Sequence, residues 1–178
     1  MTLPPEFTLY LPRGRIERRV AEMAAAIEAG FEPERTLLVG ILGGAVFFMT
    51  ELAAHLDPDY TMDFLALSSY GDGETSSGRV RLDKDVQADC EGKTALILDD
   101  ILDTGRTLAY AVAHLTAKGA ARVKGVVLLA KTHDEKTAAL VDAVGFSVPE
   151  GFYIGYGLDL AGRYRGLRDI YRKDWSHA

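Results

Sequence analysis

The chain has 178 residues, of which 48% are hydrophobic and 26% charged; this suits one soluble globular domain and excludes a disordered chain. Its net charge of −6 argues against a non-specific nucleic-acid binder, which normally presents a basic surface. No apolar run reaches the ~18 residues that span a bilayer, no basic and then apolar leader opens the chain, and Cys90 is the single cysteine. We therefore expect a cytoplasmic protein with no membrane segment, no intramolecular disulfide and no nucleic-acid partner.

The N-terminal half alternates helical and extended patterns. Two stretches repeat apolar residues every three or four positions, as on one face of a helix, and two others are short and apolar, as in buried strands. The predicted elements are a helix over 15–29, a strand over 36–41, a helix over 45–56 and a strand over 63–69. The polar, Gly/Ser-rich segment that follows, about 70–85, predicts a mobile loop leading into a short ribbon.

The C-terminal half continues this alternation. The predicted elements are a strand over 94–98, a helix around 108–115, a strand over 123–130 and a short helix over 136–141, before the apolar stretch 152–160. Strands that alternate with helices need right-handed crossovers, which give a mainly parallel sheet with helices on both faces. We therefore predict an α/β fold and a single domain over residues 1–178.

Polar residues and glycines gather where the predicted strands end, and ligands of parallel sheets bind at that edge. The loop D-T-G-R-T (103–107) joins a strand to a helix, and the free N–H groups and helix dipole at such a junction suit a phosphate. Thr104 and Thr107 add hydroxyl donors. An isolated D-T-G match is usually an ordinary turn with a capping threonine, but the order of strand, loop and helix favours the phosphate site.

Several aspartates lie near this loop. Asp99 and Asp100 could accept hydrogen bonds from vicinal hydroxyls or hold Mg²⁺; the ordinary alternative is one turn cap and one solvated side chain. Asp103 is a candidate general base. Farther along the chain, Asp159 stands in the apolar stretch GLDLAG, where it could cap a turn, but a carboxylate with no nearby cation in the sequence fits a metal-binding role.

The stretch LILDDILDTGRTL resembles the signature of the type I phosphoribosyltransferases, in which an apolar strand leads into two acidic residues, two apolar residues and D-T-G-x-T. Four further segments resemble, in order and spacing, the hypoxanthine-guanine phosphoribosyltransferases: LVGILGGAVFFMTEL (38–52), SSYGDGETSSG (68–78), LLAKT (128–132) and GFYIGYGLDLAGRYRGL (151–167). The resemblance begins at about Leu9 and covers nearly the whole chain. It implies the type I phosphoribosyltransferase fold, a twisted, mainly parallel sheet flanked by helices, with a small hood and a flexible lid loop.

The resemblance also implies a reaction in purine salvage. The 5-phosphoribosyl group of 5-phosphoribosyl pyrophosphate would pass to N9 of a 6-oxopurine, hypoxanthine or guanine. Asp103 would take a proton at purine N7, and Asp99 and Asp100 would hold the ribose hydroxyls directly or through Mg²⁺. The residues that would hold the 5′-phosphate are Thr104, Gly105, Arg106 and Thr107.

Other segments would bind the base and the pyrophosphate. Lys131 would donate to purine O6, Phe152 would stack on the base, and Tyr153 would offer backbone groups to its edge. Asp159 would bind a second Mg²⁺. The residues assigned to pyrophosphate are Gly43, Gly44 and Arg165, and in the family the glycine loop contains a non-proline cis peptide.

The resemblance further implies the outer parts of the fold. Ser69 and Tyr70 would begin the lid, and the hood would combine the N-terminal segment with about 152–178. Family members are commonly homodimers or homotetramers, so we expect a homo-oligomer.

Three other functions remain open at this point. The first is an enzyme of the same superfamily that prefers xanthine or another base. The second is an RNA-binding regulator on the same fold, which would need a basic face. The third is a nucleotide-binding module without turnover.

Overall fold

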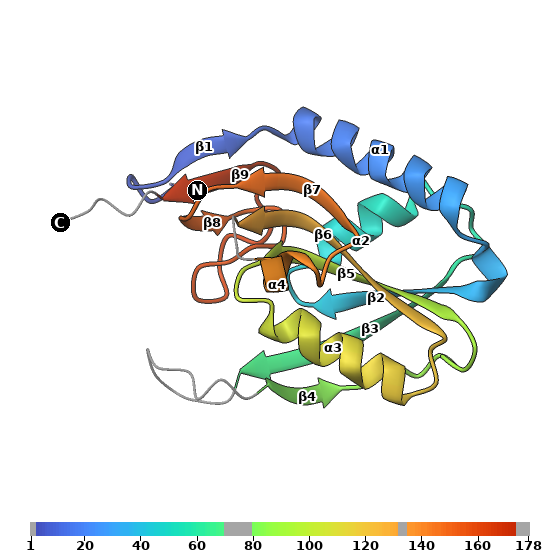
Figure 1. Cartoon of the computed structure of the whole chain (residues 1–178). Helices are drawn as coiled ribbons and strands as arrows, with labels where there is room; N and C mark the ends of the chain where they lie inside the picture. The colour runs from blue at the N-terminus through green and yellow to red at the C-terminus, as the bar shows by residue number, and fades with distance from the viewer. Residues whose placement is uncertain (1–2, 70–79, 132–134, 174–178) are drawn as a thin grey trace.

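The computed structural model describes residues 3–69, 80–131 and 135–173 (Figure 1). None of the helices in these ranges is long and apolar enough to cross a membrane. Two β-sheets of different size organise this part of the chain.

A six-stranded sheet forms the centre of the molecule. Its strands, in spatial order, are β4 (Val80–Lys84), β3 (Thr61–Ser69), β2 (Thr36–Leu42), β5 (Thr94–Leu102), β6 (Arg122–Lys131) and β7 (Ala143–Val148). All neighbouring pairs are parallel except β3 and β4, which are antiparallel. The predicted α/β class and the mainly parallel sheet are therefore confirmed.

Helices cover both faces of this sheet. The helices α1 (Arg13–Gly30) and α2 (Val46–Ala53) lie on one face and α3 (Arg106–Ala117) on the other, as Figure 1 shows. On β5, Leu96 and Leu98 belong to the core under α1 and α2, whereas Ala95 and Ile97 belong to the core under α3. Because side chains alternate between two buried faces, the strand is apolar throughout, which is why its sequence has no polar alternation. Two short helices, η1 (Pro33–Arg35) and α4 (Glu135–Ala138), complete the helical elements of the described residues.

A smaller antiparallel sheet joins the two ends of the chain. Its strands are β1 (Thr8–Leu11), β9 (Ile170–Lys173) and β8 (Phe152–Ile154), with β9 in the middle. These strands, together with the segment 155–169 between β8 and β9, are called the hood below. Figure 1 shows the hood beyond the carboxyl ends of the parallel strands, the edge at which ligands bind in such sheets.

The longest difference from the predicted elements is in β5. The strand continues past the predicted end at residue 98 to Leu102, because it pairs with β6 at Asp99↔Val127 and again at Leu102↔Ala130. Asp99 and Asp100 therefore lie inside a strand rather than after one. Pairing with β6 on one side therefore fixes the backbone that carries these two carboxylates.

Three strands were not predicted, and one helix was predicted too long. The strands β1, β7 and β9 are short and lack a clear alternation of buried and exposed residues, so their pattern gives no local signal. The helix predicted over 136–141 ends at Ala138, because the chain then makes turn hydrogen bonds and the Asp142 N–H donates to Gly125 O of β6. The predicted ribbon is present as β4, whereas residues 70–79 of the predicted lid lie outside the described residues.

Candidate active site

Six of the predicted site residues line one pocket of about 230 Å³ between the carboxyl end of the central sheet and the hood. They are Asp100, Asp103, Lys131, Phe152, Tyr153 and Asp159. The first two come from β5 and the loop after it, Lys131 ends β6, and the remaining three come from the hood. Residues from three separate segments therefore converge at one edge of the sheet.

Two adjacent carboxylates lie at the end of β5. The Asp100 N–H donates to Asp99 Oδ1 at 3.0 Å, and the Ile101 N–H donates to Asp100 Oδ1 at 2.9 Å. Burial raises the pKa of Asp99 well above its usual value, and the charge of Asp100 raises it further. Burial also raises the pKa of Asp100, although hydrogen bonds and the charge of Arg165 act against it. No salt bridge to another described residue compensates either carboxylate.

The glycine pair after β2 lies beside these carboxylates. The Leu42–Gly43 peptide is cis, as the resemblance implied. A Cβ on Gly44 would overlap the Asp100 carboxylate, so the backbone can approach it only as glycine. The place that a Cβ on Gly43 would take is 3.8 Å from the guanidinium carbon of Arg165. The fold thus brings Gly43, Gly44 and Arg165, which the sequence separates widely, to one side of Asp100.

Asp103 and Lys131 form an ion pair across the pocket. Lys131 Nζ lies 3.1 Å from Asp103 Oδ1, and the side chains are 13% and 55% exposed. A second carboxylate, Glu150, lies 3.8 Å from the same ammonium group. The lysine is therefore mostly enclosed and oriented by two acids, and the aspartate stays accessible to a ligand.

The predicted phosphate loop opens α3. Gly105 is the N-cap of the helix and has φ of +72°, which an L side chain rarely adopts. A Cβ at Gly105 would also lie 2.8 Å from Leu140 Cδ1. Since α3 has no side-chain cap, the first N–H groups of the helix stay free for an anion. Of this loop, Asp103 lines the pocket, and Thr104, Gly105, Arg106 and Thr107 follow it directly.

The predicted base-binding residues lie on β8. The ring of Phe152 is partly buried and meets Phe7 of the N-terminal segment edge to face, with ring centroids 6.2 Å apart. The Tyr153 side chain is buried, packs edge to face on Tyr10, and its hydroxyl donates to Pro149 O at 2.7 Å. Its ring therefore belongs to the hood core, so Tyr153 can meet a ligand only through its backbone.

Asp159 has a cation partner that the sequence reading missed. Arg165 Nη2 lies 2.8 Å from Asp159 Oδ1, and the Gly162 N–H donates to Asp159 Oδ2 at 2.6 Å. The expectation that no cation stands near Asp159 is wrong, because the chain between the two residues folds back on itself through the Leu160↔Arg163 bridge. Both oxygens of this carboxylate are already engaged.

The remaining predictions concern the lid. Ser69 ends β3, so the backbone places it at the start of the predicted loop. Tyr70 lies outside the described residues.

Four residues near the pocket escaped the sequence analysis. Ile101, Gly151 and Leu158 line it, and Glu150 approaches Lys131 from its rim. Ile101 and Leu158 are ordinary apolar residues in apolar stretches, so nothing in their pattern distinguishes a pocket wall from a core position. The dipeptide Glu150-Gly151 beside Phe152 carried a weak signal, since a glycine before a predicted binding residue often allows a close approach.

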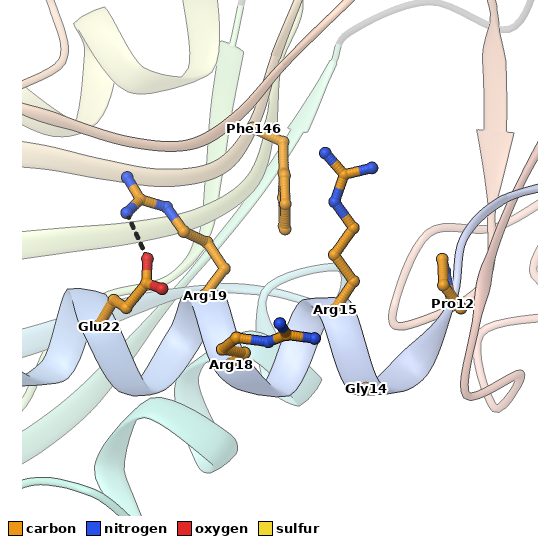
Figure 2. Close-up of a pocket in the computed structure, with 7 residues that line it drawn as sticks. All are labelled: Pro12, Gly14, Arg15, Arg18, Arg19, Glu22 and Phe146. Carbon is orange, nitrogen blue, oxygen red and sulfur yellow. Dashed lines mark hydrogen bonds and ion pairs between the residues drawn. The ribbon is translucent and has the colours of Figure 1, made fainter.

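A larger hollow of about 620 Å³ lies over the first turns of α1 (Figure 2). Figure 2 shows Arg15 beside Phe146, with the guanidinium 5.5 Å from the ring centroid. Arg19 donates to the carbonyl oxygens of Val144 and Gly145, each at 2.9 Å. These contacts tie α1 to the edge strand β7. The smaller pocket, which holds the aspartates and Lys131, is the candidate active site.

The donor set of this pocket suits Mg²⁺ bound together with a substrate. Within the described residues, no group of three His, Cys, Asp or Glu side chains could hold a metal ion by itself. Mg²⁺ usually keeps several waters and takes one or two carboxylates together with substrate phosphates. Asp99 and Asp100, which form no salt bridge with another described residue, offer oxygen ligands of this kind, whereas Asp159 would first have to give up an existing partner.

Comparisons with known proteins agree with this geometry. The family model for the phosphoribosyl transferase domain matches residues 9–160. The hypoxanthine-guanine phosphoribosyltransferase of Bacillus subtilis is 41% identical over 152 residues, which are 85% of this chain and 84% of that protein. The bifunctional protein TilS/HprT of Listeria innocua is 44% identical over 159 residues; the match covers 89% of this chain but only 24% of that longer protein.

A solved structure extends the likeness to three dimensions. The hypoxanthine phosphoribosyltransferase of Trypanosoma cruzi, solved in complex with the product IMP, superposes with a TM-score of 0.81 and 32% sequence identity. The superposition covers 98% of each chain. The likeness therefore includes the hood as well as the central sheet.

Proposed function

Since this chain belongs to the phosphoribosyl transferase domain family, and within it to the hypoxanthine-guanine phosphoribosyltransferases, we propose that it salvages hypoxanthine and guanine. It transfers the 5-phosphoribosyl group of 5-phosphoribosyl pyrophosphate to N9 of the base and yields IMP or GMP and pyrophosphate. The observation that carries the proposal is the Asp103–Lys131 pair at 3.1 Å, in the pocket that Asp100 and the hood also line. Asp103 can accept a proton and Lys131 can donate a hydrogen bond, so the pair is complementary to a purine ring that has both an acidic N–H and a carbonyl oxygen.

Base recognition follows from this pair. Lys131 donates to O6 of the purine, and a 6-amino group in that place would meet a cation that cannot accept its hydrogen bond. Asp103 accepts the proton at N7 as the bond from C1′ to N9 forms and the bond from C1′ to the pyrophosphate oxygen breaks. Phe152 stacks on the ring, and the backbone of Tyr153 meets its edge.

The ribose and the 5′-phosphate lie on the sheet side. Asp99 and Asp100 accept hydrogen bonds from the two ribose hydroxyls or hold Mg²⁺ beside them. The loop of Thr104, Gly105, Arg106 and Thr107 receives the phosphate with the free N–H groups of α3. Support for this placement comes from the two adjacent carboxylates, which form no salt bridge with another described residue, and from the helix terminus without a side-chain cap.

The pyrophosphate lies between Gly43, Gly44 and Arg165. Arg165 exchanges its bond to Asp159 for the pyrophosphate, and Asp159 is the residue that would hold a second Mg²⁺. When bound, Mg²⁺ would supply positive charge against the departing pyrophosphate. Arg165 stabilises the same charge from this chain.

The proposal also includes a lid, an oligomeric state and a cellular location. The lid that begins with Ser69 and Tyr70 excludes water from the reactive sugar. A homodimer or homotetramer and a cytoplasmic location are expected from the resemblance to the family.

A coupled assay tests the proposal. Purified protein is mixed with 5-phosphoribosyl pyrophosphate, Mg²⁺ and one of hypoxanthine, guanine, xanthine or adenine. We expect turnover with hypoxanthine or guanine and little with adenine. Turnover with xanthine alone would instead indicate an enzyme of the same superfamily with another base, and no turnover with any 6-oxopurine would refute the proposed activity.

A further inference from the structure

We propose that Glu51 and Tyr156 are positioning residues that hold the pyrophosphate side of the site in place. The inference rests on the proposed function and adds a role for residues that the family signature does not single out in this sequence. Tyr156, in the hood, is completely buried, and its hydroxyl donates to Glu51 Oε2 of α2 at 2.5 Å. Glu51 in turn lies 2.8 Å from Arg13 Nη1 at the start of α1. Three separate elements meet in this contact.

The charges of this cluster are balanced. The Glu51 side chain is 13% exposed, and a carboxylate at that depth is tolerated only where it is paired and hydrogen-bonded. Arg13 supplies the opposite charge, and its guanidinium also lies 5.5 Å from the centroid of the Tyr156 ring. Burial and the charge of Glu51 raise the pKa of Tyr156 far above its usual value, so the hydroxyl remains a donor at all working pH values.

The position of Tyr156 is transmitted to Arg165 through Gly157. The Gly157 N–H donates to Arg165 O at 2.9 Å, and Arg165 Nη1 donates to Gly157 O at 2.6 Å. A Cβ on Gly157 would overlap Gly44 O, so this turn of the hood packs directly on the glycine loop after β2. Any shift of Tyr156 therefore moves the guanidinium that we assign to pyrophosphate.

The residues assigned to the base are held by other contacts. Phe152 and Tyr153 pair with Lys173 and Arg172 of β9, and the Tyr153 hydroxyl has its own acceptor in Pro149 O. Loss of the Glu51–Tyr156 bond should therefore loosen the pyrophosphate side and leave the base side intact. This selectivity separates a positioning role from a general contribution to stability.

The test compares Tyr156→Phe and Glu51→Gln with wild type. Glu17→Gln is the matched control, because Glu17 also pairs with Arg13, at 2.7 Å, but on an exposed helix face. Tyr156→Phe removes the hydrogen bond, and Glu51→Gln removes the negative charge that strengthens it and pairs with Arg13. We expect each change to raise KM for 5-phosphoribosyl pyrophosphate about tenfold, equivalent to about 1.4 kcal/mol, and to leave KM for hypoxanthine within about twofold. The two single effects should be less than additive in the double variant, since both changes act on the contact between Tyr156 and Glu51, although Glu51→Gln also weakens the pairing with Arg13.

Calorimetry of pyrophosphate binding with Mg²⁺, in the absence of any base, gives a second readout. The same variants should bind pyrophosphate about tenfold more weakly than Glu17→Gln does. Equal changes in both KM values, additive single effects, or pyrophosphate binding equal to that of Glu17→Gln would overturn the inference. If wild type makes no nucleotide, the proposed function fails, and the calorimetry still decides this inference.

Discussion

The two sides of the pocket hold their carboxylates in opposite states. At the end of β5, Asp99 and Asp100 are buried next to each other, and burial raises the pKa of both. In the hood, Asp159 is 31% exposed and has a guanidinium at 2.8 Å and a backbone N–H at 2.6 Å. The first pair forms no salt bridge with another described residue, although the charge of Arg165 acts on Asp100, whereas Asp159 already has a salt bridge.

This difference indicates how each side would respond to substrate. A ligand that brings Mg²⁺ and hydroxyl groups relieves the repulsion between the two carboxylates of β5. This repulsion in the protein without ligand therefore favours binding there. A ligand at the hood must first compete with the Asp159–Arg165 pair. We therefore expect the sheet side to dominate binding energy and chemistry, and the hood to set the response to pyrophosphate.

The largest expected effect is on chemistry at the sheet side. Asp103→Asn removes the proton acceptor but keeps the shape of the side chain, so kcat should fall by roughly 10²–10³ with both KM values nearly unchanged. Steady-state kinetics with hypoxanthine measures this. A fall confined to KM would mean that Asp103 binds the base without taking a proton.

The second effect compares the two sides directly. In wild type, 5-phosphoribosyl pyrophosphate with Mg²⁺ at about 100 times its Kd should add about 2.7 kcal/mol to the free energy of unfolding, and thus raise Tm by roughly 5–10 °C. Asp100→Asn should lose most of this rise, because it removes a negative charge that no salt bridge with another described residue engages.

Asp159→Asn is the matched variant on the hood. It should keep most of the rise in Tm, because Arg165 becomes free to bind the phosphates. Melting curves of the three proteins with and without ligand decide the matter. Equal losses in both variants would break the proposed difference between the sheet and the hood.

The third effect concerns selectivity at the rim. Lys131→Ala removes the donor to O6, and the preference for hypoxanthine over adenine, expressed as a ratio of kcat/KM values, should fall at least about tenfold. The variant also frees Asp103 from its ion pair, so the kcat for hypoxanthine is measured in parallel. An unchanged preference would contradict the assignment of Lys131 to the carbonyl oxygen.

The sheet side could be predicted from the sequence because its signal is local. An apolar strand, a D-T-G-R-T loop and an amphipathic helix follow one another within residues 94–117, and each part is recognisable by itself. The end of β5 was misplaced, since its last residues are set by pairing with β6 and not by their own apolar pattern.

The hood could be predicted only in outline because its contacts are not local. Thr8 pairs with Arg172 in the small sheet, and no pattern in either short strand reveals the other. Likewise, the hydroxyl of Tyr156 meets Glu51 of a helix far back along the chain. The resemblance supplied residues for the site, such as Arg165, but the pairing of Arg165 with Asp159 follows only from the fold.

The smallest expected effect is the pH dependence of unliganded stability. The pKa values of Asp99 and Asp100 are higher in the folded protein than the usual value of about 3.9, so the folded state binds more protons above that pH. The stability that this pair contributes is therefore full below about pH 4 and is lost as the pH rises through the raised values. Asp63 behaves in the opposite way, because hydrogen bonds from Ala88 and Phe64 outweigh burial and lower its pKa to about 2. The stability that Asp63 contributes is therefore full above about pH 4 and is lost only as the pH falls below that value.

Asp99→Asn isolates the pair, because the amide removes the buried charge while Asp63 is unchanged. The free energy of unfolding of the variant minus that of wild type should be near zero at pH 4 and should become increasingly positive as the pH rises towards 8, since only the carboxylate acquires a buried charge. Urea unfolding at several pH values, without substrate or Mg²⁺, measures this difference. A difference that stays constant with pH would mean that the carboxylates at β5 are as well compensated as Asp159, and the contrast between the two sides of the pocket would disappear.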